Sequence, residues 1–167
     1  MKKSSIIIVA IFIGILAWLF LDPIIAVPKD KLARQDLASK ISTVEIARQN
    51  IKVEVVDTDT KRQLGLSGHA PLADNQGMLF VFDQPAKYGF WMKDMTFPLD
   101  IIWFSSDLPL TKGEVGGGRV IYIEKNLQPS SYPNSFGPDQ NSLYVLEVNA
   151  GFSDKNNLKI GDEVKFK

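Results

Sequence analysis

The chain has 167 residues, and its 19 basic and 19 acidic side chains give a formal net charge of zero. This length and an apolar content of 45% predict one folded domain and exclude a wholly disordered chain. The absence of cysteine and the single histidine exclude disulfides, a cysteine nucleophile and metal sites built from thiolates or several imidazoles. A neutral chain also gives no reason to expect a nucleic-acid partner.

An apolar segment at the N-terminus predicts a membrane anchor. Residues 6–21 contain neither charge nor proline, and the apolar stretch resumes at residues 24–27. Together they approach the roughly 20 apolar residues that a spanning helix needs. The alternative is a cleaved signal peptide, with Ala26 as the small residue at the cleavage site. We therefore expect residues 1–27 to form a signal anchor or transmembrane helix in a single-pass protein.

The charges that flank the apolar segment nearly balance, since the leader with Lys2 and Lys3 is opposed by Lys29, Lys31 and Arg34 on the other side. The leader resembles the start of an exported protein, and the absence of cysteine is compatible with an oxidising compartment, so we expect the C-terminal domain outside the cytoplasm. Residues 1–50 have seven basic and four acidic side chains, net +3, whereas residues 51–167 have twelve and fifteen, net −3. The basic part can lie against anionic lipid headgroups while the acidic domain stands off from them, so we expect the membrane to be a partner.

The next segment, residues 28–50, predicts a partly helical juxtamembrane stalk. It has no glycine, and Leu32, Leu37 and Ile41 recur at loosely helical intervals. We interpret this segment as a solvated spacer that holds the following domain away from the bilayer.

Residues 51–167 predict a mainly β domain. Ile51, Val53 and Val55 alternate with charged residues, which is the pattern of a half-buried strand. Short runs rich in β-branched and aromatic residues then recur between turn signals, many of them prolines, and they predict strands at 77–82, 88–92, 100–104, 119–123 and 143–148. The closing residues 160–166 predict a turn that leads into a last strand. Many short strands of this kind are typical of a compact β-sandwich or barrel-like domain.

Two short helices and one glycine turn are expected within the β domain. One helical turn covers residues 58–66, and a second follows Gly151, with Ser153 as its cap. The run Gly116-Gly117-Gly118 lacks the spacing and the following helix of a phosphate-binding loop, so it predicts a flexible hairpin tip.

Three stretches of the domain resemble one known family. They read VEVVDTDTKRQLGLSG, GMLFVFDQPAKYGFWMKDMTFPLDIIWF and YVLEVNAGFSDKNNLKIGDEV. In this order they closely resemble the family called domain of unknown function 192, over all of residues 51–167. The resemblance implies a compact β-rich domain, often exported or tethered to a membrane, with no established biochemical activity. Asp94 and Met95 stand where the family usually has Asn followed by Thr.

Five residues are candidates for a ligand-binding site: Arg62, Trp91, Lys93, Asp100 and Glu147. Charged side chains beside apolar strands need partners if they are buried, so one interpretation is a structural cluster of arginine and carboxylates. The functional alternative is a groove in which the Trp91 indole stacks on a polar ligand, such as a glycan or a peptide, and the charges orient it. On this alternative the protein is a binding or accessory module at the cell envelope.

A second hypothesis is an envelope hydrolase that acts on glycan or peptide. Asp100 and Glu147 could serve as acid and base if their carboxyl groups lay at the separation that glycosidases require. Gly65-Leu66-Ser67-Gly68-His69 resembles a nucleophile elbow, but His69 replaces the second glycine and a strand-to-helix context is missing. Whether the protein is an enzyme stays open, with a non-enzymatic role favoured.

A third hypothesis is a Cu(I) site, because imidazole and thioether ligands select Cu(I) and His69, Met92 and Met95 could supply them. Core packing is, however, the ordinary role of methionine, and alternation along a strand places Trp91 and Met92 on opposite faces. We therefore expect no cofactor and no resident metal.

Overall fold

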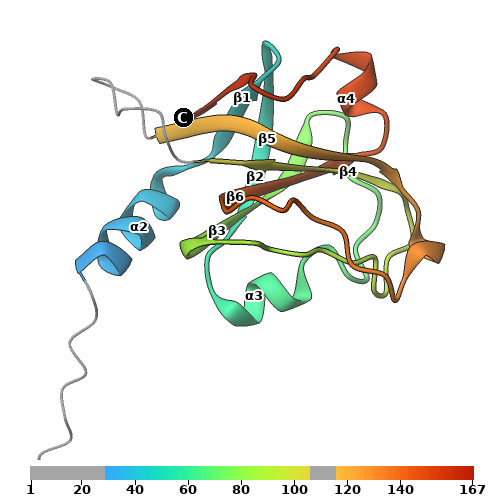
Figure 1. Ribbon diagram of the computed structural model, residues 1–167, viewed down its shortest axis with the longest axis horizontal. Helices are drawn as coiled ribbons and strands as arrows, with labels where there is room; N and C mark the ends of the chain where they lie inside the picture. Colours follow the sequence, from blue (N-terminus) through green and yellow to red (C-terminus); the bar gives the residue numbers. More distant parts are fainter. Residues whose placement is uncertain (1–28, 106–115) are drawn as a thin grey trace, which may run out of the picture.

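The computed structural model describes residues 29–105 and 116–167, whose strands form a closed barrel (Figure 1). Around the barrel the strands follow the order β1-β2-β3-β6-β4-β5-β7, and β7 returns to β1. The elements are α2 (Lys29–Lys40), β1 (Thr43–Ile46), β2 (Gln49–Val56), α3 (Asp59–Leu64), β3 (Gln76–Ala86), β4 (Leu99–Phe104), β5 (Gly116–Leu127), η1 (Pro129–Ser131), β6 (Ser142–Asn149), α4 (Phe152–Lys155) and β7 (Glu163–Phe166). The predicted mainly β domain with short helices is confirmed.

One parallel pair of strands interrupts an otherwise antiparallel barrel. β2 and β3 run in parallel, with Val55 opposite Leu79, whereas the other neighbouring strands are antiparallel. Parallel neighbours need a long crossover, which residues 57–75 provide. The crossover contains α3 and carries this helix across the outside of the barrel (Figure 1).

Apolar side chains fill the barrel interior, because successive residues of a strand face opposite sides of the sheet. Ile102 and Phe104 of β4 face inward, as do Leu146 and Val148 of β6. Every strand contributes to this core, which includes Val44, Ile46, Ile51, Leu79, Val81, Val120, Val164 and Phe166. Each such side chain stabilises the fold by about 1.5–3 kcal/mol when fully buried.

A second apolar layer covers the outer side of β3, β6 and β4. The alternate residues of these strands point away from the interior, and they are buried because the residues after α3 and segment 88–97 pack over them. This layer includes Met78, Phe80, Leu99, Ile101, Trp103 and Val145 from the strands, together with Leu66, Met92 and Phe97 from the covering segments. The candidate site lies in this outer layer.

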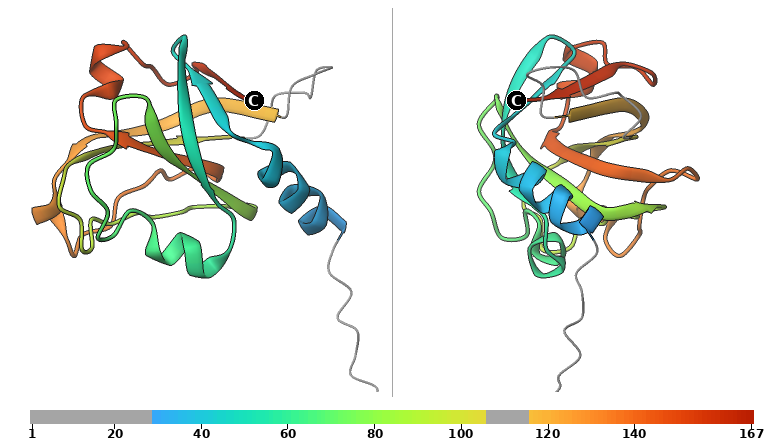
Figure 2. Two further views of the ribbon diagram at one scale, coloured as in Figure 1. Left: turned by 180° about the vertical axis from the view of Figure 1, so that it is seen from behind. Right: turned by 90° about the vertical axis from the view of Figure 1, so that its left-hand side faces the viewer.

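The segment that the sequence predicts to be a free stalk is part of the folded domain. Its helical part is α2, which is attached to the end of β3 (Figure 2). The Arg34 guanidinium donates to the Asp83 carbonyl oxygen, Lys31 forms a 3.1 Å ion pair with the Asp83 carboxylate, and Ala38 is buried. α2 is therefore a docked helix and not a solvated spacer.

The barrel also begins before residue 51, where the sequence pattern placed the domain boundary. β1 pairs with β2 and with β7, and its Val44 and Ile46 side chains are buried in the interior. Four residues were too short a strand to be recognised inside a segment with helical spacing. Across residues 29–105 and 116–167, no helix is long and apolar enough to span a membrane. The predicted anchor at residues 1–27 lies outside the described residues.

Residues 88–92 do not form the predicted strand. They cross the outer face of the barrel, and their ladder is one bridge in which Phe90 and Phe136 exchange hydrogen bonds of 2.7 and 2.8 Å. The predicted alternation is present all the same, since Met92 is buried and Trp91 is exposed. An extended segment that alternates between a covered surface and solvent has the same sequence pattern as a strand.

The triple glycine is not a hairpin tip. Gly116-Gly117-Gly118 begins β5 and pairs with β7 from Phe166 to Val164. A Cβ atom on Gly117 would overlap the Val164 carbonyl group, so the close approach of the two strands requires glycine at this position.

Candidate functional site

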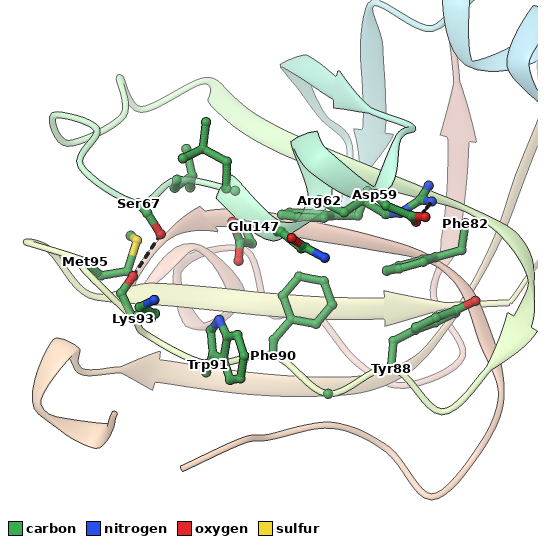
Figure 3. Close-up of a pocket in the computed structure, with 16 residues that line it drawn as sticks. Asp59, Arg62, Ser67, Phe82, Tyr88, Phe90, Trp91, Lys93, Met95 and Glu147 are labelled. Atoms are coloured by element: carbon green, nitrogen blue, oxygen red, sulfur yellow. Dashed lines mark hydrogen bonds and ion pairs between the residues drawn. The ribbon is translucent and has the colours of Figure 1, made fainter. Parts of the chain in front are cut away.

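A pocket lies on the outer wall of the barrel, between α3 and segment 88–95 (Figure 3). Its cavity volume is about 280 Å³. Ligand pockets for drug-sized molecules start at about 300 Å³, so this one suits a single small group such as a sugar ring. The close-up view shows Arg62 and Asp59 on the α3 side, segment 88–95 opposite them, and Glu147 between the two.

The helix α3 positions Arg62 at the edge of the pocket. Thr58 caps the helix by accepting a hydrogen bond from the Lys61 amide, which confirms the helical turn predicted at 58–66. The guanidinium group of Arg62 donates to Asp59 and to the Val81 carbonyl oxygen, both at 2.6 Å, and it lies 5.2 Å from the centre of the Phe82 ring. Arg62 therefore attaches α3 to β3 and is committed to these contacts.

Aromatic side chains build the opposite wall. The Phe90 ring contacts Phe80 and Trp103 edge to face, with ring centroids 4.8 and 5.6 Å apart, and the Trp103 indole donates to the Tyr88 carbonyl oxygen at 2.8 Å. At one end, Tyr88 stacks on the Phe82 ring. These contacts hold segment 88–92 against the barrel without a strand ladder.

Trp91 leaves its indole accessible at the pocket. Its side chain is 55% exposed, and its ring meets Tyr132 edge to face with centroids 6.4 Å apart. Large exposed aromatic surface of this kind is a feature of binding sites, because burial against a ligand removes it from water.

Lys93 and Ser67 close the other end of the pocket. The Ser67 hydroxyl donates to the Lys93 carbonyl oxygen at 2.9 Å, and the Gly68 amide donates to Asp94 at 3.0 Å, so the turn after α3 is fastened to the facing segment. Among the described residues, the Lys93 ammonium group has no ion-pair or hydrogen-bond partner. It is free to contact a ligand or solvent.

Glu147 lies at the floor of the pocket. Its side chain is 5% exposed, and the Oε2 atom has no hydrogen-bond partner. The residues opposite Glu147 on the two neighbouring strands are Met78 and Ile101, both apolar. Burial raises the pKa of the Glu147 carboxyl group from its ordinary value of 4.5 to about 8. At neutral pH this group is a carboxylic acid that can both donate and accept a hydrogen bond.

Asp100 is not part of the pocket, contrary to the predicted site. Its carboxylate accepts hydrogen bonds from the amides of Asn126 (2.8 Å), Gly151 (3.1 Å) and Ser153 (2.8 Å). It thereby caps α4, so the cap is Asp100 and not Ser153, which lies inside the helix. Asp100 is a buried structural residue that joins β4 to the neighbouring strand β5 and to the start of α4.

The structure also contradicts both predicted arrangements of the charges. No cluster of arginine and carboxylates forms, because Arg62 pairs with Asp59 while Asp100 and Glu147 contact neither arginine nor lysine among the described residues. The acid and base pair fails as well. Asp100 is opposite Val148, one residue beyond Glu147, so the two carboxyl groups face opposite sides of the sheet.

The remaining chemical motifs are separated in space. Ser67 lines the aromatic pocket, but His69 lines a different hollow beside Pro71 and Met78, and both residues follow a helix where a nucleophile elbow follows a strand. Met92 is buried in the outer apolar layer, whereas Met95 lines the pocket. The proposed ligands of Cu(I) thus do not share a cavity.

The sequence prediction therefore identified four residues that share the pocket, namely Arg62, Trp91, Lys93 and Glu147. It missed Asp59, Phe82 and Tyr88. The signal for Phe82 and Tyr88 was present in the aromatic-rich stretch, but their meeting depends on the chain folding back after β3.

Fold and pocket together define a small closed β-barrel with a ligand-sized site on its outer wall. The chain belongs to the DUF192 family, described as uncharacterized ACR, whose model matches residues 41–166. The similar solved structures include two proteins. A protein of unknown function from Novosphingobium aromaticivorans is 29% identical, with a TM-score of 0.65 over 74% of this chain and 84% of that one. A protein from Sinorhizobium meliloti, whose description suggests a transcription regulator, is 27% identical, with a TM-score of 0.64 over 74% and 90%. No curated protein matches the chain.

Proposed function

We propose that the domain is a non-enzymatic binding module that holds a polar ligand of the glycan class in the pocket between α3 and segment 88–95. One observation carries the proposal: an aromatic-lined cavity has at its floor a buried carboxyl group whose Oε2 atom lacks a partner. A buried polar atom without a partner costs about 1–3 kcal/mol, which a ligand can recover by supplying the hydrogen bond.

The architecture favours a glycan over a peptide. Many peptide-binding domains add the peptide as an extra strand to an open sheet edge. The barrel formed by the described strands is closed, so its wall offers no such edge. A sugar ring needs instead a flat aromatic surface and a few hydrogen-bonding groups, which Trp91 and Glu147 supply.

The pocket also supports binding rather than hydrolysis. Glycosidases use two carboxyl groups that flank the same bond. Asp59 is the second carboxylate at the pocket. It lies at the outer edge of the pocket and forms an ion pair with Arg62. Asp100 faces the other side of the sheet.

We propose further that the module works at the cell envelope, with residues 1–27 as its membrane anchor and the barrel outside the cytoplasm. Support comes from the uncharged run at residues 6–21 and from the positive leader Lys2 and Lys3. A reporter enzyme fused after Lys167 tests this topology. Activity of the reporter only in the cytoplasm would contradict it.

Binding of glycans by the purified full-length protein, screened on an array and measured by calorimetry, tests the proposed function. We expect a saccharide to bind, and Trp91→Ala to weaken binding at least tenfold, because loss of the main aromatic contact of a binding site removes about 2 kcal/mol. Ile160→Ala is the matched control, since Ile160 is also large, apolar and exposed but lies outside the pocket. Absence of binding to any saccharide, or binding to a peptide alone, would overturn the proposal.

A further inference from the structure

The feature that identifies the ligand chemistry is the environment of Glu147. Its two cross-strand neighbours are Met78 and Ile101, so the sheet supplies no polar partner. A core position of this kind would be more stable with an apolar residue, because a buried unsatisfied carboxyl group weakens the fold. An acidic residue at the floor of a cavity is therefore best explained by what it binds.

The cations at the pocket do not neutralise Glu147. From α3, Arg62 is engaged by Asp59 and by the Val81 carbonyl oxygen. From the facing segment, Lys93 and Tyr88 border the cavity, and no ion pair or hydrogen bond joins either of them to Glu147 within the described residues. The groups that surround the carboxyl group thus leave it uncharged and able to donate.

We propose that Glu147 donates a hydrogen bond, as an uncharged acid, to the amide carbonyl oxygen of an acetamido sugar bound in the pocket. This inference rests on the proposed function and specifies its ligand class. The amide carbonyl is a strong acceptor, and the acetamido methyl group can pack on the apolar walls formed by Phe80, Phe90 and Leu66.

The size of the pocket agrees with this assignment. A cavity of about 280 Å³ accommodates one substituted sugar ring, and neighbouring rings of an oligosaccharide would continue over the exposed Trp91 and Tyr132 rings. An anionic sugar is disfavoured at the floor, because its carboxylate would have to leave water there between Met78 and Ile101, whereas the free Lys93 ammonium group lies at the end of the pocket.

Ionisation of Glu147 removes the donor and places a negative charge against the ligand carbonyl oxygen. Binding should therefore be strong where the carboxyl group is protonated and weak where it is ionised. Because burial raises the pKa of Glu147 to about 8, a ligand that binds only the acid form loses at least about tenfold in affinity between pH 6 and pH 9.5.

Calorimetry with three trisaccharides tests the inference on the full-length protein. The probes are triacetylchitotriose, cellotriose, which lacks the acetamido groups, and trigalacturonic acid, which is anionic. We expect triacetylchitotriose to bind at least tenfold more tightly than the other two at pH 6 and to lose at least tenfold in affinity at pH 9.5. Glu147→Gln, which keeps an uncharged donor in the same shape, should bind it equally at both pH values.

The outcomes separate the inference from the proposed function. If cellotriose or trigalacturonic acid binds as well as triacetylchitotriose, or if binding by the wild type does not change with pH, the inference is wrong but the glycan-binding function stands. If Glu147→Gln remains folded and binds no better at pH 9.5 than the wild type, the carboxyl group is not the donor. If none of the three trisaccharides binds, the inference is wrong, and the proposed function fails with it only if no other saccharide on the array binds. Circular dichroism at each pH shows that the compared proteins are folded.

Discussion

Asp100 and Glu147 lie on paired strands one residue out of register, and this offset gives two buried carboxyl groups opposite roles. Asp100 is opposite Val148 and turns toward three backbone amides, whereas Glu147 is opposite Ile101 and turns into the pocket. Because side chains alternate along a strand, a shift of one residue decides which side of the sheet each group faces. Mutations at the two positions should consequently differ in kind.

Asp100→Ala should destabilise the domain by about 3–5 kcal/mol, because three backbone amides, among them that of the buried Ser153, lose a buried charged acceptor. Urea unfolding measured by fluorescence gives this difference. Asp154→Ala is the control, since Asp154 is an exposed carboxylate on the helix that Asp100 caps. A change of less than 0.5 kcal/mol in Asp100→Ala, on the order of an ordinary surface substitution, would show that the cap is not structural.

Glu147→Gln should remove a pH dependence of stability. Below pH 4.5 the carboxyl group is protonated in both states; between pH 4.5 and about 8 the folded state holds a proton that the unfolded state releases. Stability of the wild type therefore falls as pH rises through this window, by roughly 1.4 kcal/mol per pH unit at most. Unfolding curves at pH 5, 6, 7 and 8 for both proteins measure the difference in slope. Parallel curves would contradict the assigned protonation of Glu147.

Arg62→Ala should loosen α3, because its guanidinium group joins the helix to β3 and packs on Phe82. The side chain is 10% exposed, so its loss leaves the Val81 carbonyl without its donor at a cost of about 1–3 kcal/mol. Compared with the wild type, Arg62→Ala should increase the rate of amide hydrogen exchange in α3 and leave that of β4 nearly unchanged. Lys61→Ala, on the exposed side of the same helix, should leave exchange nearly unchanged, and equal effects of the two substitutions would refute this role.

Phe90→Ala and Trp91→Ala should separate stability from binding, although the residues are adjacent. Phe90 contacts Phe80, Phe82 and Trp103, so its truncation should cost about 3–5 kcal/mol. Trp91 is more than half exposed, so Trp91→Ala should lower the free energy of unfolding by less than about 1 kcal/mol. The same substitution should still remove most of the ligand affinity. Thermal unfolding combined with calorimetry checks both. A larger loss of stability in Trp91→Ala would mean that the indole supports the wall of the pocket.

A shortened chain that starts at Ile41 should fold cooperatively, and one that starts at Ile51 should not. The longer version keeps β1, which pairs with β2 and β7, while the shorter one leaves two strands of the barrel unpaired along one edge. Two-dimensional NMR spectra give the answer through dispersed or collapsed amide signals. Dispersed spectra for the chain starting at Ile51 would place β1 outside the essential fold.

The sequence predicted most strands because their apolar residues alternate or form short runs between turns. β1 was not predicted, because Val44 and Ile46 belong to a strand of only four residues that follows shortly after the helix α2. The prediction of a strand at 88–92 was wrong, because alternation of apolar and polar residues shows that one side of a segment is buried. It does not show that the backbone pairs with another strand. The local sequence pattern predicts which side of a segment is buried. It does not predict which distant segment packs against that side.

The same limit applies to the site. Arg62, Trp91, Lys93 and Glu147 stood out as charged or aromatic residues beside apolar runs, and the structure places all four at one pocket. Asp100 stood out for the same reason, yet its partners are amides at Asn126, Gly151 and Ser153. Backbone amides are present at nearly every position, so no sequence signal distinguishes a carboxylate that binds them from one that binds a ligand.

Pairing between the first and last strands of the barrel constrains when the domain can fold. The Ser42 and Thr43 amides donate to the Lys167 carbonyl oxygen, and Val44 pairs with Phe166. Contacts of such large sequence separation form slowly, because closing the long intervening loop costs entropy before the contact compensates it. During synthesis the barrel therefore cannot close until β7 has left the ribosome, and β1, although it is made first, must wait for its last partner.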